Sequence, residues 1–161
     1  MGRHSADGRA AEGGRRFRVG LAVGLAGIGA LGGVGVGHAG PELVEGTPCT
    51  RAADACVSLA AGKAWLIDEG EIVRGPVAIS SGAAATPTPR GDFAVQWKNR
   101  DHRSREFDGA PMPYAVFFAP GGIAFHQGSL DRPSAGCVRL ATADASAFFD
   151  HLEVGDRVEV R

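Results

Sequence analysis

The strongest constraint on the fold is a series of short apolar runs, several alternating with period two and most bounded by turn residues. Residues 63–67 and 72–79 flank a polar turn at 68–71, which is the pattern of a β-hairpin. A proline-containing loop is expected at 80–91. Further strands are predicted at residues 56–60, 92–98, 114–118, 123–125 and 157–160, with Val158 and Val160 of the last strand facing inward. The chain therefore encodes a mostly β domain.

One segment near the C-terminus has the period of a helix instead. Thr142 is predicted to cap it and Asp144 suits its first turn, where a negative charge is favourable. Its apolar face is formed by Ala145, Phe148, Phe149 and Leu152. One short helix on a set of strands predicts a small domain, and the pattern alone fits a sandwich or a barrel equally well.

Residues 1–39 have the composition of a targeting segment. Five arginines precede an uncharged run at 19–36, and Gly37-His38-Ala39 supplies the small residues that a signal peptidase reads. We predict a signal peptide cleaved after Ala39. The alternative is an N-terminal membrane anchor that stays in place, since a span needs about 20 apolar residues and this run is marginal. Either way the protein is expected to be exported to the cell wall or periplasmic space, touching membrane only through an uncleaved segment.

We expect the remainder to divide into an irregular lead-in at 40–54 and one folded domain at 55–161. After Ala39 the chain carries 12 basic and 16 acidic residues, a formal net charge of −4. This charge gives no footprint for nucleic acid, so nucleic acid is not an expected partner. The basic residues that cluster at 98–105 alternate with acidic ones and predict a solvated loop. His102 and His151 are likewise expected to be solvated.

The three cysteines fall into a pair and a single residue. Cys49 and Cys56 lie close together, and in an exported protein they predict a local disulfide, with two reduced, buried thiols as the alternative. Cys137 stands apart and is expected to be a free, reactive thiol. No second pair with zinc-ligand spacing follows, so no metal is expected.

The most informative stretch for function joins His126 to Cys137, eleven residues later, within Ser134-Ala135-Gly136-Cys137-Val138-Arg139. A cysteine is a strong nucleophile as its thiolate, and a nearby imidazole can take the thiol proton and later return it to a leaving group. The alternatives are an inert buried thiol and a core histidine. The backbone N–H groups of Gly136 and Cys137 are the natural oxyanion hole for such a nucleophile.

Residues 125–129 and 134–140 together resemble the catalytic signature of the L,D-transpeptidases, the YkuD-type family of bacterial cell-wall enzymes. The resemblance covers roughly residues 55–160, and residues 86–93 resemble the family's Thr-Pro-x-Gly-x-Phe segment with two residues inserted. Two departures are His126-Gln127-Gly128 where members usually have His-Gly, and Ala135 where many have a second histidine. Sortases fit less well because a Thr-Cys motif is expected there, and papain-like peptidases run Cys before His.

The resemblance implies a β-sandwich-like YkuD fold and a cell-wall activity that needs no cofactor. Cys137 would attack the carbonyl joining the third residue of a peptidoglycan stem tetrapeptide, a diamino acid, to its terminal D-alanine. An amine of a neighbouring stem would resolve the thioester as a cross-link, whereas water would make the protein an L,D-carboxypeptidase. A non-catalytic wall-binding module is a further alternative. Carbapenem-type β-lactams are expected to acylate Cys137 as inhibitors.

Three side chains are expected to bind substrate, namely Arg139, Ser134 and Tyr114. Arg139 either anchors a substrate carboxylate in a bidentate fork or holds the loop through an ion pair. Ser134 is expected to hydrogen-bond within the cysteine loop, and Tyr114 either lines the pocket or joins the core. The resemblance also implies that a backbone carbonyl just after the histidine, at Gln127 or Gly128, orients the imidazole.

Overall fold

A computed structural model describes residue 40 and residues 42–161. The predicted signal peptide or membrane anchor at 1–39 lies outside the described residues. Within the described residues, no helix has the length and apolar character needed to cross a membrane.

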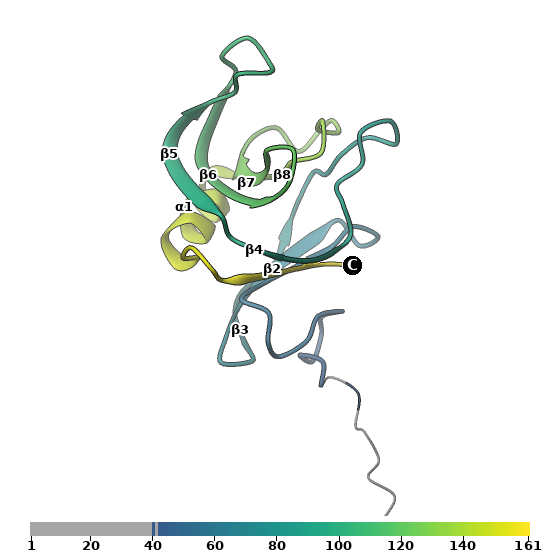
Figure 1. The fold of residues 1–161 in the computed structure, drawn as a ribbon. Coiled ribbons are helices and arrows are strands. Elements are labelled where there is room, and N and C mark those ends of the chain that lie inside the picture. Colours follow the sequence, from purple (N-terminus) through teal and green to yellow (C-terminus); the bar gives the residue numbers. More distant parts are fainter. Residues whose placement is uncertain (1–39, 41) are drawn as a thin grey trace, which may run out of the picture. The chain divides into compact units, whose positions relative to one another are not determined.

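The described chain folds into two β-sheets and one helix (Figure 1). The five-stranded sheet has the order β3 (Glu71–Ala78), β2 (Lys63–Asp68), β1 (Ala55–Ser58), β9 (Arg157–Val160), β4 (Gly91–Ala94). The four-stranded sheet has the order β5 (Trp97–Arg103), β6 (Pro111–Ala119), β7 (Ile123–Gln127), β8 (Val138–Leu140). The helix α1 spans Thr142–His151. The predicted mostly β, sandwich-like fold with one helix near the C-terminus is confirmed.

The predicted hairpin and closing strand are both present. β2 and β3 pair antiparallel across the expected turn, with Asp68 opposite Glu71. β9 carries Val158 and Val160, both buried, and runs parallel to β1 and antiparallel to β4. The C-terminal strand therefore lies inside its sheet, between β1 and β4. Its pairing with β1 joins the end of the chain to the first strand.

The main core is aromatic where the helix meets the four-stranded sheet. Phe118 of β6, Phe125 of β7 and Phe148 of α1 are fully buried, with ring centroids 4.7 Å and 5.1 Å apart along this series. Burying a side chain of this size contributes about 1.5–3 kcal/mol. The helix is thereby fixed against β6 and β7, the two inner strands of the four-stranded sheet, on the face opposite to the cavity described below.

Residues 92–98, predicted as one strand, are divided between two sheets. β4 ends at Ala94 and β5 begins at Trp97. Between them Val95 is buried, and its backbone exchanges hydrogen bonds with Asp156 and Gly155. The chain crosses from one sheet to the other at this point. The predicted loop at 98–105 is also wrong, because β5 continues to Arg103 as an edge strand, on which Arg100, Asp101 and Arg103 are exposed and Lys98 is mostly covered.

The start of α1 differs from its prediction. Ala141 occupies the N-cap position and no side chain caps the helix, so Thr142 is already the first helical residue. Asp144 does lie in the first turn, where it pairs with Arg74 of β3 at 2.8 Å. This ion pair joins the helix to the other sheet.

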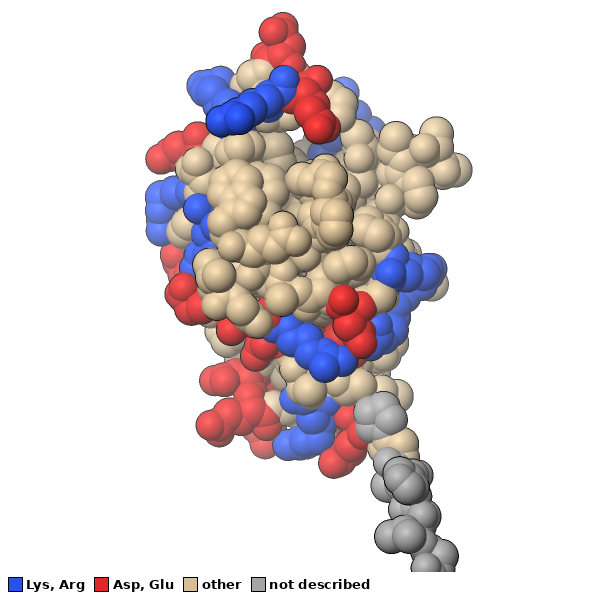
Figure 2. All heavy atoms as spheres, in the orientation of Figure 1, with Lys and Arg blue, Asp and Glu red and all other residues tan. Residues whose placement is uncertain are grey.

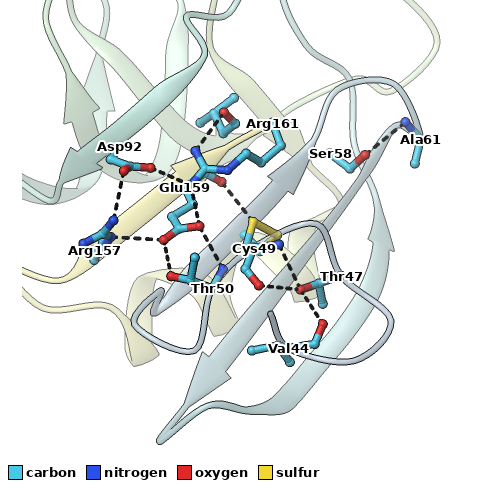
Figure 3. Close-up of a disulfide and its surroundings, with 12 residues drawn as sticks. Val44, Thr47, Cys49, Thr50, Ser58, Ala61, Asp92, Arg157, Glu159 and Arg161 are labelled. Atoms are coloured by element: carbon cyan, nitrogen blue, oxygen red, sulfur yellow. Dashed lines mark hydrogen bonds and ion pairs between the residues drawn. A yellow bond between two sulfur atoms is a disulfide. The ribbon is translucent and has the colours of Figure 1, made fainter. Parts of the chain in front are cut away.

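The lead-in is fastened to the domain by a disulfide and a buried carboxylate (Figure 3). Cys49 and Cys56 form the predicted disulfide. Glu159 of β9 is fully buried, accepts hydrogen bonds from the backbone N–H and hydroxyl of Thr50, and pairs with Arg157 at 3.1 Å and Arg161 at 2.6 Å. A buried carboxylate is stable only when its partners replace water. The lead-in supplies two of those partners, so it belongs to the folded domain.

Candidate active site

The register of two parallel strands brings Cys137 and His126 to one face of the four-stranded sheet. His126 of β7 lies beside Arg139 of β8, and Phe125 lies beside Val138. Because side chains alternate between faces along a strand, Cys137 and Arg139 project to the same side as His126. The thiol, the imidazole and the guanidinium all line a single cavity of about 730 Å³.

The walls of this cavity come from the hairpin of β5 and β6 and from the turns around the cysteine. β5 contributes Trp97 and His102, β6 contributes Met112 and Phe117, and residues 121–123 form the turn that leads into β7. Figure 2 shows charged side chains gathered at the tip of the β5–β6 hairpin, at the top of the view, and largely uncharged surface below it. The cavity wall is mixed, because apolar side chains such as Trp97, Met112 and Phe117 lie among polar and charged ones that include Arg105, Glu106 and Arg132.

The imidazole of His126 is held in one tautomer. Its Nδ1 lies 2.8 Å from the carbonyl oxygen of Gln127, and a carbonyl only accepts, so Nδ1 carries the proton and Nε2 the lone pair. The side chain is buried. Burial lowers the pKa of His126, the positive charges of Arg139 and His102 lower it further, and the Gln127 contact opposes them. The ring is therefore poised as a neutral base.

The thiol of Cys137 is half-buried against an apolar cluster that includes Phe117 and Ala124. Its Sγ donates to the carbonyl of Gly122 at 3.6 Å. Burial raises the pKa of Cys137, against an opposing hydrogen bond from Ala124 and the charge of Arg139. Both pKa shifts favour the neutral forms, a thiol at Cys137 and an uncharged imidazole at His126, and both groups line the same cavity.

The loop before Cys137 is fixed by a buried network of hydroxyl groups. Ser134 Oγ donates to the carbonyl of Cys137 at 2.5 Å and accepts the N–H of Gly136 at 3.1 Å. Thr88 Oγ1 donates to the carbonyl of Gly136 at 2.7 Å. Gly136 has φ +118°, which L side chains rarely adopt, and a Cβ there would also displace Ile123 Cδ1 at 2.6 Å, so this position favours glycine. Ser134 therefore does form hydrogen bonds within the cysteine loop. One of them takes up the N–H of Gly136, which was one of the two expected oxyanion donors.

Arg139 and Tyr114 occupy different environments. Arg139 lines the cavity while donating to the carbonyls of Arg132 and Pro133, each at 3.3 Å, so it bridges the loop and the site. Tyr114 is not among the cavity residues and packs on Phe149 of α1, on the opposite face of the sheet. Side chains of a regular strand alternate between the two faces, so Tyr114 would share the cavity face with Met112. The φ of +59° at Tyr114 interrupts this alternation. The structure therefore does not bring Tyr114 to the site.

Two residues of the site escaped prediction from the sequence. His102 was expected to be solvated, yet it is half-buried in the cavity wall, edge-on to Trp97 and Phe117 at 5.3 Å and 5.0 Å. Thr88 was marked only by its place in the Thr-Pro segment. His151, also expected to be solvated, is half-buried at the end of α1 and lies outside the cavity. Among residues 42–161 no group of three or more His, Cys, Asp or Glu side chains is arranged to hold a metal ion.

Comparison with known proteins gives one family. The profile of the L,D-transpeptidase catalytic domain (YkuD) matches residues 53–160. The structure resembles an L,D-transpeptidase from Stackebrandtia nassauensis at 27% identity and a TM-score of 0.63, over 66% of this chain and 54% of that one. It resembles L,D-transpeptidase 1 of Mycobacterium tuberculosis at 28% identity and a TM-score of 0.57, over 66% and 60%.

A third similar structure is the L,D-transpeptidase LdtMt1 solved in complex with imipenem, at 26% identity and a TM-score of 0.61, over 68% of this chain and 59% of that one. No curated protein matches the sequence. The chain spans less than two thirds of the length of each of these solved structures. The family profile nevertheless covers most of the chain and includes both His126 and Cys137. The protein belongs to the L,D-transpeptidase catalytic-domain (YkuD) family.

Proposed function

We propose that this protein is a cysteine-dependent L,D-transpeptidase acting on peptidoglycan stem tetrapeptides. The observation that carries the proposal is the pairing of a free thiol with a tautomer-fixed imidazole on one face of the sheet, inside one cavity. Family membership supports the reaction type. The imipenem complex of a similar L,D-transpeptidase supports carbapenems as inhibitors of this chain as well.

In the proposed reaction, Sγ of Cys137 attacks the carbonyl carbon between the third residue and the terminal D-alanine, while Nε2 of His126 takes the thiol proton. The tetrahedral intermediate collapses as the C–N bond breaks, and the imidazolium gives its proton to the departing amine of D-alanine. A thioester remains on Cys137. An amine of a second stem then attacks the thioester, and the third-position residues are joined with the thiol restored.

The oxyanion of each intermediate requires donors that are in place beforehand. The N–H of Cys137 is the proposed donor, because the N–H of Gly136, the other donor expected from the sequence, already donates to Ser134 Oγ in the free protein. Removing one such donor typically costs about 3–4 kcal/mol of transition-state stabilisation. Arg139 is the proposed anchor for a substrate carboxylate at the cavity wall.

The proposed place of action is outside the cytoplasm, at the cell wall or in the periplasmic space. The disulfide between Cys49 and Cys56 supports this, because such bonds form and persist in oxidising compartments. Peptidoglycan stems are accessible there.

The test is mass spectrometry of a disaccharide-tetrapeptide after incubation with the purified protein, beside its Cys137→Ala variant. Loss of D-alanine with formation of a dimer, in the wild type only, is the expected result. Loss without a dimer would identify an L,D-carboxypeptidase instead. A protein that binds peptidoglycan but leaves the tetrapeptide intact would refute the enzyme and indicate a wall-binding module.

A further inference from the structure

A row of side chains runs across the four-stranded sheet from the thiol to an exposed indole. Phe117 of β6 lies opposite Trp97 of β5 on one side and Ala124 of β7 on the other. The β7–β8 register then places Cys137 beside Ala124. Neighbouring strands are spaced about 4.8 Å apart, so three steps along this row separate the Cys137 and Trp97 backbones by roughly 14 Å.

Trp97 presents one face of its ring to the protein and leaves the other open. Its ring stacks on Phe117 with centroids 3.7 Å apart and an interplanar angle of 6°. Phe117 is 3% exposed beneath this stack, whereas Trp97 is 42% exposed. His102 meets both rings edge-on and holds the pair in place. The result is an uncharged aromatic platform at the cavity wall that is already formed in the free protein.

The reaction in the cavity does not use this platform. Nothing in the proposed acyl transfer requires an exposed indole. Covering Phe117 does not explain the tryptophan either, because any apolar side chain at position 97 would cover it. The electron-rich face of an aromatic ring does attract the C–H bonds of a pyranose, which presents several on one side of the ring. A flat, exposed indole face is therefore a suitable surface for a sugar ring.

The donor stem is long enough to cover most of the row. Three residues separate the carbonyl under attack from the sugar that carries the stem, and three extended residues span roughly 10–11 Å. A stem laid across β7 and β6 would bring its sugar over β5. We propose that Trp97 is a binding platform for the pyranose ring to which the donor stem is attached, so that the enzyme recognises glycan as well as peptide. This inference rests on the proposed function for its substrate and deepens it.

A comparison of two donors tests the platform in catalysis. The ratio of kcat/KM for a disaccharide-tetrapeptide to kcat/KM for the free tetrapeptide should be about fivefold in the wild-type protein, the size of a good aromatic contact. Trp97→Leu should bring this ratio to about one, and Trp97→Phe should restore part of it. Val73→Ala removes an exposed apolar side chain outside the cavity and should keep the wild-type ratio. A wild-type ratio of one, or a ratio unchanged in Trp97→Leu, would overturn the proposal.

A binding measurement separates this inference from the proposed function. The chain has two tryptophans, and Trp65 is buried, so a change in tryptophan fluorescence reports mainly on Trp97. The full-length Cys137→Ala protein is titrated with the N-acetylglucosamine–N-acetylmuramic acid disaccharide. A saturable change supports contact with Trp97, and the same titration followed by calorimetry, which does not depend on the tryptophan signal, should show binding that is lost in Cys137→Ala/Trp97→Leu, even if no tetrapeptide is turned over. No fluorescence change, or calorimetric binding that persists in the double variant, refutes the platform.

Discussion

Ser134→Ala tests whether the buried serine hydroxyl sets the position of the nucleophile. The hydroxyl makes two hydrogen bonds, to the carbonyl of Cys137 and from the N–H of Gly136, and the residue is buried. Truncation leaves both backbone groups without this partner where water has little access. Each such loss costs about 1–3 kcal/mol, and because the loop can relax we expect a total of about 2–3 kcal/mol in the free energy of unfolding.

Thermal unfolding and carbapenem acylation together measure the effect. At this chain length the expected loss corresponds to a fall in Tm of roughly 10 °C. A small displacement of the thiol also slows acylation, by about tenfold to a hundredfold. Ser58→Ala is the matched control, since that hydroxyl accepts an exposed N–H far from the site. A Ser134→Ala protein with unchanged Tm, or one that is destabilised but acylated at the wild-type rate, would refute the positioning role.

Three further predictions concern the base, the tight turn and the buried carboxylate. Because burial lowers the pKa of His126, the rate of acylation should rise with pH to a plateau, with a midpoint below the ordinary histidine value of about 6.5; a midpoint above it would contradict a neutral base. Gly136→Ala puts a Cβ against Ile123 at a positive φ, and should lower Tm and acylation together; unchanged values of both would show that the turn tolerates a side chain. Glu159→Gln should lower the free energy of unfolding in urea by about 2 kcal/mol, because the carboxylate is fully buried. Asp92→Asn is the control, since Asp92 pairs with the same arginines on their exposed side and its loss should change the free energy of unfolding little. Equal losses would show that burial does not make the Glu159 contacts more important.

The sequence predicts best what depends on local periodicity. The hairpin of β2 and β3 and the closing strand β9 follow from alternation and turn residues alone. The pairing of His126 with Cys137 was suggested by chemistry and by the family signature, and the parallel register of β7 and β8 explains how the fold brings the two together. The disulfide followed from the spacing of the cysteines and the expectation of export.

The features that escaped prediction depend on contacts between distant segments. Alternation at 92–98 marks a strand but carries no information about where the chain changes sheet, which is decided by the contacts of Val95 with residues 155–156. The charged neighbours of His102 in the sequence suggested a solvated side chain. The expectation failed because β5 is an edge strand that exposes one face to solvent, while its other face, which carries His102, lines the cavity. Tyr114 itself has a left-handed backbone conformation. This interrupts the alternation of β6 and turns the Tyr114 side chain to the face opposite to the one that a regular strand would give it.

Intact-protein mass spectrometry after incubation with imipenem tests the central claim, that Cys137 is the nucleophile and His126 its base. The account predicts that the wild-type protein gains the mass of one imipenem and that Cys137→Ala gains none. It also predicts that His126→Gln gains the same mass much more slowly. Equal labelling of wild type and Cys137→Ala, or no labelling of the wild type, would contradict the assignment of the active site.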